Sequence, residues 1–281
     1  RKNQYIRQTV PVAHSCMAIA TTLAGAGAVG GMAGLRQCFN AHLFGRFLPV
    51  SLCFAMGLSM KMMAVDHFQA GTIKIVGQLR LATTAILSTL VLTKIYSLSK
   101  WLVLGIITTS CALFVQLKGD AREREGQPWK WSGLAQLISW VLLNSLGGVI
   151  AERSYKRLDE PFYAQKVAED WGHLLTGLVM LLVIVPRFKE DQDIRKRKHG
   201  FFDAWDTRTV VVLLFLFLDA WVSNWLLKRF SVVVRGVAKA FAITAVYFTS
   251  LLYAKDRRKN SALTPAALLV IMSSALYFSV N

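Results

Sequence analysis

Apolar stretches about as long as a bilayer is thick recur along the whole chain, and they constrain its fold more than any other feature. A helix that crosses a hydrocarbon core of about 30 Å needs roughly 20 apolar residues. The strands of a membrane barrel would instead give alternating segments of about 10 residues, which this sequence lacks. The sequence therefore predicts an all-α, polytopic membrane helix bundle. The nine predicted spans are residues 12–34, 47–65, 70–93, 101–117, 132–152, 171–186, 209–227, 233–254 and 263–280.

The connections between these spans are short, so residues 1–281 are predicted to form a single transmembrane domain. The first span, 12–34, is rich in Ala and Gly, which suits close helix packing; a flexible linker is the alternative. The formal net charge of +17 lies mostly in the loops, where it is typical of topogenic charge at membrane surfaces rather than of nucleic-acid binding. The four cysteines have no metal-ligand spacing, so no metal or cofactor is expected.

Six charged residues fall inside the predicted spans, and they need an explanation. A charge at mid-membrane costs roughly 2.5–3.5 kcal/mol on the insertion scale, so it should face a cavity or a partner. Lys61 and Lys74 lie near span ends, where a lysine can extend to the interface. Asp219 can neutralise one of the others, and Lys239 is the candidate. The six are Lys61, Lys74, Arg80, Asp219, Arg235 and Lys239.

Arg80 lies about ten residues into its span, and Arg80 and Arg235 are the best candidates for ligand binding. The planar guanidinium suits phosphate oxygens, so a cation-rich cavity predicts an anionic, phosphate-bearing solute. Each arginine lies on the second-last span of its half of the chain. Secondary transporters often bind their substrate between two such repeats, near the bilayer midplane.

At these residues the sequence resembles the nucleotide-sugar transporter family, in the CMP-sialic acid and UDP-galactose transporter branch of the drug/metabolite transporter superfamily. The likeness covers residues 47 to 281. Arg80 and Arg235 stand where the family has two lysines, and Val232 and Asp219-Ala220 replace an Asn and a Gly-Gly pair. The four stretches that carry the likeness are "FQAGTIKIVGQLRLATTAILSTLVLTKIYSLSKW", "GGVIAERSYKR", "GFFDAW" and "LKRFSVVVRGVAKAFAI".

The resemblance implies ten spans arranged as two inverted five-helix repeats, of which this chain, beginning at Arg1, is expected to lack the first. It implies antiport of a nucleotide sugar, with a pyrimidine base expected, against a nucleoside monophosphate across the Golgi membrane; the ER is the alternative. Arg80 and Arg235 would bind phosphates. The other polar contacts would be Gln78, Lys74, Asn144 and Ser231, and Asp219 with Lys239 would form a gate or counter-ion pair. A homodimer is left open.

Two other functions compete with nucleotide-sugar transport. A drug/metabolite-type carrier of another phosphorylated or organic anion fits the rewritten contact residues. A membrane-embedded transferase would need paired acids holding a metal beside phosphate. The acidic pairs Asp159-Glu160, Glu169-Asp170 and Glu190-Asp191 are predicted to lie in solvated loops, so no enzyme is expected. The orientation also stays open, because the distribution of Lys and Arg favours the opposite topology to that of the family.

Overall fold

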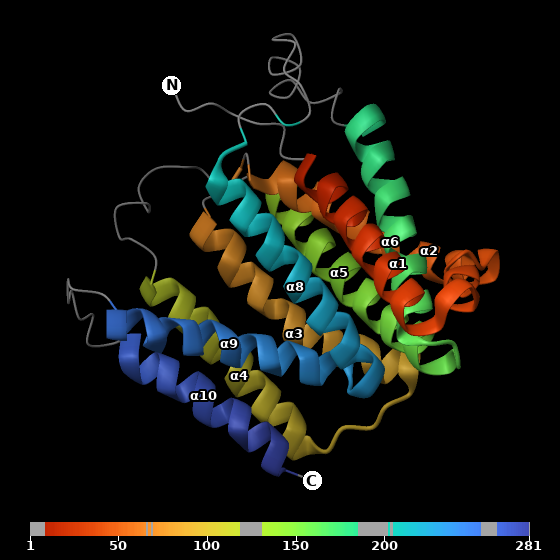
Figure 1. Cartoon of the computed structure of the whole chain (residues 1–281). Coiled ribbons are helices and arrows are strands. Elements are labelled where there is room, and N and C mark those ends of the chain that lie inside the picture. The colour runs from red at the N-terminus through yellow and green to blue at the C-terminus, as the bar shows by residue number, and fades with distance from the viewer. Residues whose placement is uncertain are drawn as a thin grey trace. The chain divides into compact units, whose positions relative to one another are not determined.

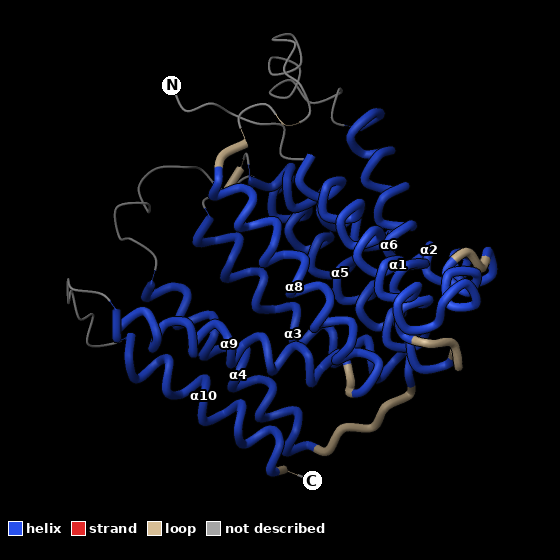
Figure 2. The backbone as a smooth tube through the Cα atoms, in the orientation of Figure 1, coloured by secondary structure: helices blue, strands red, loops and turns tan. Residues whose placement is uncertain are grey.

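The computed structural model describes residues 9–65, 67–68, 70–118, 131–184, 202, 205–253 and 263–280. Over these residues the elements are helices and no strand is present (Figure 2). A short π-helix, η2, continues the sixth helix. The elements are α1 (Thr9–Cys38), α2 (Ala41–Val65), α3 (Ala70–Leu92), α4 (Leu98–Lys118), α5 (Trp131–Arg157), α6 (Phe162–Val179), η2 (Met180–Ile184), α8 (Thr207–Arg229), α9 (Val232–Tyr253) and α10 (Leu263–Ser279).

Every predicted span coincides with a helix, which confirms the all-α prediction. Seven helices of the described chain are long and apolar enough to cross a membrane: α1 to α5, α8 and α9. The apolar α10 has 17 residues and is shorter. The weakest prediction, 12–34, corresponds to the 30-residue α1, interrupted at Gly31 by a φ of 55° that glycine adopts without steric cost. The chain is a multi-pass membrane protein.

The sixth helix differs from the prediction. The span was expected to start at residue 171, but α6 begins at Phe162. The expectation that Glu169-Asp170 lies in a solvated loop is wrong, because both side chains lie on α6 and are at most 1% exposed. Three formal charges in one short segment lower its hydropathy, and the sequence pattern alone indicated a loop there.

The chain divides into two compact units. Unit 1 comprises residues 1–55 and 150–229, and unit 2 comprises residues 56–149 and 230–281. Helices α2 and α5 each contribute residues to both units. The arrangement as two inverted repeats stays a prediction.

Unit 1 is built on the packing of α1 against α6 and α8. Ala26, Cys38 and Val167 form a buried apolar cluster there, with Tyr163 and Trp171 packed against it. A Cβ at Gly34 would lie 2.6 Å from the carbonyl oxygen of Ala26, so the absence of a side chain lets the two parts of α1 on either side of Gly31 approach closely.

Unit 2 contains α3, α4, α9 and α10 with parts of α2 and α5. Helix α4 packs against α3 and α10, and α9 packs against α3 and α10 (Figure 1). Two apolar clusters hold these helices together. One consists of Phe114, Tyr247, Leu263, Ala266 and Ala267, and the other of Ala64, Ile73 and Leu137. The packing brings the middle of α3 beside the first turns of α9.

Asp206 caps the N-terminus of α8, which gives a testable pH dependence. Its Oδ1 accepts hydrogen bonds from the Oγ1 and the backbone N–H of Thr209, each at 2.8 Å, and these bonds lower the pKa of its carboxyl. A lowered pKa in the folded state means that the cap stabilises α8 above the ordinary aspartate pKa and that this stabilisation is lost as the pH falls through the lowered value.

We therefore expect the first turn of α8, which contains Thr209, to fray on acidification in the wild type but not in Asp206→Asn, whose amide oxygen caps without titrating. Amide exchange of Thr209, each variant being compared with its own intrinsic exchange rate at the same pH, measures this. Equal pH dependence in both proteins would contradict the assignment.

Candidate functional site

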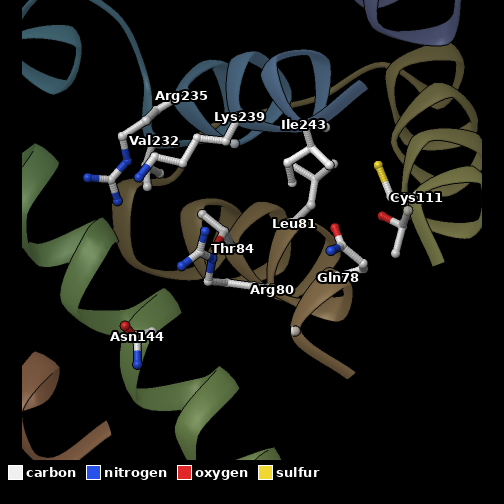
Figure 3. Close-up of a pocket in the computed structure, with 14 residues that line it drawn as sticks. Gln78, Arg80, Leu81, Thr84, Cys111, Asn144, Val232, Arg235, Lys239 and Ile243 are labelled. Carbon is white, nitrogen blue, oxygen red and sulfur yellow. The ribbon is translucent and has the colours of Figure 1, made fainter. Parts of the chain in front are cut away.

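Unit 2 encloses a polar cavity of about 100 Å³ between α3, α4, α5 and α9. Figure 3 shows its labelled lining residues around a common space. The lining combines three basic side chains with amides, hydroxyls and small residues. Its residues are Gly77, Gln78, Arg80, Leu81, Thr84, Thr108, Cys111, Asn144, Val232, Arg235, Gly236, Lys239, Ala240 and Ile243.

Three cations give this cavity its charge. Arg80 comes from α3, and Arg235 and Lys239 come from α9, where their spacing of four residues places them on one face of the helix. Their nitrogen atoms point toward the same part of the cavity (Figure 3). None of the lining residues is acidic. The charged groups of the lining are therefore all positive, which suits an anion.

The start of α9 places Arg235. Ser231 caps this helix, because its Oγ accepts a hydrogen bond of 3.1 Å from the N–H of Val234. The carbonyl of Ser231 accepts another, of 3.0 Å, from the N–H of Arg235, so the arginine sits in the first turn. A Cβ at Gly148 would lie 3.1 Å from Nη2 of Arg235, so the guanidinium rests against α5 where that helix has no side chain.

A hydrogen bond from α5 fixes the backbone of α3 at Arg80. The Oγ of Ser145 donates a hydrogen bond of 3.3 Å to the carbonyl of Arg80, which joins α5 to the middle of α3. Two predicted amide contacts lie nearby. Nε2 of Gln78 donates to the carbonyl of Lys74 at 3.3 Å, and Nδ2 of Asn144 donates to the carbonyl of Trp140 at 3.1 Å. These bonds orient both amides along their own helices at the cavity wall.

The cavity brings together Arg80, Arg235, Gln78 and Asn144 from the predicted contact residues. Lys74 and Ser231 are not among its lining residues. Lys74 is exposed, in keeping with its position near a span end, and Ser231 acts on the cavity through the helix start described above. Direct contact of either with a ligand stays a prediction.

The predicted gate pair is divided between the two units. Lys239 lines the cavity of unit 2. Asp219 lies on α8 in unit 1, where its Oδ1 accepts a hydrogen bond of 3.4 Å from Oγ of Ser223. Pairing of Lys239 with Asp219 stays a prediction. Lys61, which was expected to extend to the interface, has its Nζ 5.0 Å from the centre of the Trp140 ring, a cation–π contact.

Sequence reasoning missed the hydroxyl and small residues that complete the cavity. Thr84 and Thr108 line it, and both are buried. Thr84 lies one helical turn after Arg80, so a search for hydroxyls four residues from a cation within a predicted span would have found it. Thr108 belongs to a different helix and depends on the packing of α4 against α3, which no local pattern reveals.

Comparison with known proteins identifies the family of the chain. The family described as "Nucleotide-sugar transporter" matches residues 44–278. Proteins named UDP-N-acetylglucosamine transporter from Canis lupus familiaris and Bos taurus are 24% identical over 218 residues, and the one from Homo sapiens is 24% identical over 217. Each match covers 76% of this chain and 64% of the relative, so the chain spans somewhat less than two thirds of the matched proteins. The family match includes α3, α5 and α9, which carry the basic cavity, and the chain belongs to the nucleotide-sugar transporter family.

Proposed function

We propose that the protein carries a nucleotide sugar across a membrane in exchange for the corresponding nucleoside monophosphate. The observation that carries this proposal is the cavity of unit 2, in which Arg80, Arg235 and Lys239 meet and no lining residue is acidic. Charged groups inside a membrane protein are retained where they face a solute pathway. Three cations suit the two or more negative charges of a nucleotide's phosphates, and both exchanged solutes carry such phosphates.

The cavity is sized for the phosphates alone. Its volume of about 100 Å³ is below the roughly 300–1,000 Å³ of pockets that enclose a whole ligand. We assign Arg80 and Arg235 to the phosphate oxygens, with Gln78 and Asn144 as neighbouring polar contacts. The base and the sugar need room outside this cavity, so the residues that choose them lie beyond its lining.

The names of the relatives guide the choice of substrate. The matched proteins from three mammals are called UDP-N-acetylglucosamine transporters, so a UDP sugar exchanged for UMP is the first pair to test. Uracil is a pyrimidine, in line with the base expected from the sequence. We place the protein in the Golgi membrane, with the ER as the alternative.

Exchange in proteoliposomes tests the proposal. Purified full chain is reconstituted in vesicles preloaded with UMP, CMP, GMP or buffer, and uptake is followed for labelled UDP-N-acetylglucosamine, UDP-galactose, CMP-sialic acid and GDP-mannose. We expect uptake of a UDP sugar that is faster from UMP-loaded than from buffer-loaded vesicles. If folded, inserted protein takes up none of the four, nucleotide-sugar transport is refuted and other phosphorylated metabolites become the candidates.

Gly148→Ala should weaken nucleotide binding without unfolding the protein. The added methyl would lie 3.0 Å from Cγ2 of Val232 and 3.1 Å from Nη2 of Arg235, so the guanidinium has to move by a few tenths of an ångström. We expect UMP affinity to fall by up to about tenfold, or ~1.4 kcal/mol. Gly105→Ala is the matched control, because nothing lies within 4 Å of its Cβ. Equal affinities in the two variants, measured by calorimetry, would contradict the placement of Arg235.

A further inference from the structure

Unit 1 contains a cluster of ionisable side chains that the cationic cavity does not use. Lys166, Glu169, Asp170 and His173 follow the i, i+3, i+4, i+7 spacing of a single face of α6. The first three are at most 1% exposed. Buried charges are costly unless they are paired and hydrogen-bonded, so the contacts of each member decide what the cluster can hold.

Glu169 is fully satisfied. Its Oε2 accepts hydrogen bonds from the hydroxyl of Tyr155, at 2.6 Å, and from Nδ2 of Asn224 on α8. Its Oε1 lies 3.6 Å from Nε2 of His173. The backbone carbonyl of Glu169 also accepts a hydrogen bond of 3.0 Å from Oγ of Ser51 on α2. Donors from two other helices, α5 and α8, therefore stabilise the charged form of this carboxylate, and α2 bonds to the backbone of the same residue.

Asp170 is satisfied on one oxygen only. Its Oδ1 contacts Nζ of Lys166, which also lies 3.9 Å from Oε2 of Glu169. Its Oδ2 is buried and has no hydrogen-bond partner among the described residues. A buried carboxylate oxygen without a donor loses its hydration and gains nothing in return. Adding a proton to Asp170 removes the larger cost, that of burying the charge.

The charge balance of the cluster points to the same conclusion. Lys166 supplies one positive charge against the two carboxylates of Glu169 and Asp170. The other buried acid on the facing part of α5, Glu152, has its own ion pair with Lys156 at 2.7 Å. The two carboxylates and the one ammonium together carry one negative charge in excess, which one bound proton neutralises.

We propose that Asp170, with Lys166 and His173, forms a proton-binding site in unit 1 that exchanges one proton with water while the protein works. The step is protonation of the Asp170 carboxylate at the oxygen Oδ2 by a proton from solvent, and its reversal. His173 is the most accessible member, with 25% of its side chain exposed, and it lies beside Glu169. Chains of acids and histidines inside membrane proteins are typical of proton pathways.

The groups around α6 are consistent with a proton as the ligand. From α1, His14 interacts electrostatically with Lys166, Glu169 and His173, and its Nε2 is buried without a hydrogen-bond partner in the described structure. From α5 come Tyr155 and the Glu152–Lys156 pair. From α8, Lys228 donates to Gln165 at 3.1 Å. The described residues contain no group of three or more His, Cys, Asp or Glu that could hold a metal ion, and the ammonium of Lys166 already contacts both carboxylates.

Infrared difference spectroscopy of the full chain in lipid nanodiscs tests the site without any substrate. Between about pH 8 and about pH 5, the range in which histidine-coupled groups titrate, we expect a protonated-carboxyl band to grow in the wild type. Asp170→Asn should abolish this band, and Glu152→Gln should leave it, since Glu152 has its own ammonium partner. His173→Gln should shift the pH midpoint at which this band appears. This second variant keeps the test valid if Asp170→Asn does not fold. Any of three results would overturn the proposal. The band could be absent in the wild type, it could persist in Asp170→Asn, or its midpoint could be unchanged in His173→Gln.

A second readout rests on the proposed function. In proteoliposomes, the pH profile of UDP-sugar exchange should flatten in Asp170→Asn and keep its shape in Glu152→Gln. A profile for Asp170→Asn as steep as that of the wild type would overturn the proposed role of the proton in the working cycle. The infrared titration separates the two proposals, because a band without any exchange refutes nucleotide-sugar transport and leaves the proton site standing.

Discussion

Arg80→Ala is expected to reduce the affinity for UMP by about 30- to 1,000-fold. The guanidinium is one of three cations in the cavity of unit 2, whose lining contains no acidic residue. Truncation of one partner of a desolvated, hydrogen-bonded charge pair typically costs 2–5 kcal/mol, and the lower part of that range, 2–4 kcal/mol, corresponds to the stated loss. Calorimetric titration of purified protein with UMP measures it.

Two further variants make this result specific. Arg80→Lys keeps the charge but replaces a two-pronged donor with a point charge, so we expect an intermediate loss. Arg46→Ala removes a cation from α2 at a position that is exposed and outside the cavity lining, and it should bind UMP as the wild type does. If Arg46→Ala loses as much affinity as Arg80→Ala, binding depends on overall positive charge and the cavity is not the site.

Lys166→Met is expected to lower the stability of the protein by about 3–5 kcal/mol. It removes the ammonium that contacts Asp170 and lies 3.9 Å from Glu169, and both carboxylates are at most 1% exposed. Removal of one partner of a buried pair typically costs about 3–5 kcal/mol, because the other charge is left without compensation. Denaturant unfolding in detergent, followed by the tryptophan fluorescence, gives the change in free energy.

The control for this prediction is Lys156→Met. Lys156 also pairs with a buried acid, Glu152, but its own side chain is 38% exposed, so water can reach the place of the lost ammonium and we expect a smaller loss of stability than in Lys166→Met. The double variant Lys166→Met/Asp170→Asn removes a charge of each sign and should recover part of the stability. Wild-type stability in Lys166→Met would show that the pair is not buried in the membrane-embedded protein.

The positions of the helices were predictable because a long apolar stretch in a bilayer has to satisfy its own backbone hydrogen bonds, and a helix does so within one segment. Arg80 and Arg235 were recognisable for a related reason, since a charge within such a stretch stands out. The cluster on α6 was not recognisable in the same way. Three charges close together resemble a loop, and the burial of Glu169 depends on Tyr155 and on Asn224, which is 55 residues away in the sequence.

Ser231 shows a different limit of sequence reasoning. The resemblance implied that Ser231 contacts the substrate, and the structure shows its Oγ capping α9. A serine just before an apolar helix is typical of an N-cap. The sequence around Ser231 was therefore also consistent with a capping role. Thr84 and Thr108 enter the cavity only through the packing of α3 and α4, which a linear pattern does not contain.

The structure of the protein with UDP-N-acetylglucosamine bound in a lipid nanodisc tests the central claim most directly. We predict density for the diphosphate in the cavity of unit 2, with phosphate oxygens within hydrogen-bond distance of the guanidinium groups of Arg80 and Arg235. A nucleotide sugar bound with its phosphates away from both arginines, or a cavity that stays empty at saturating ligand, would contradict the account.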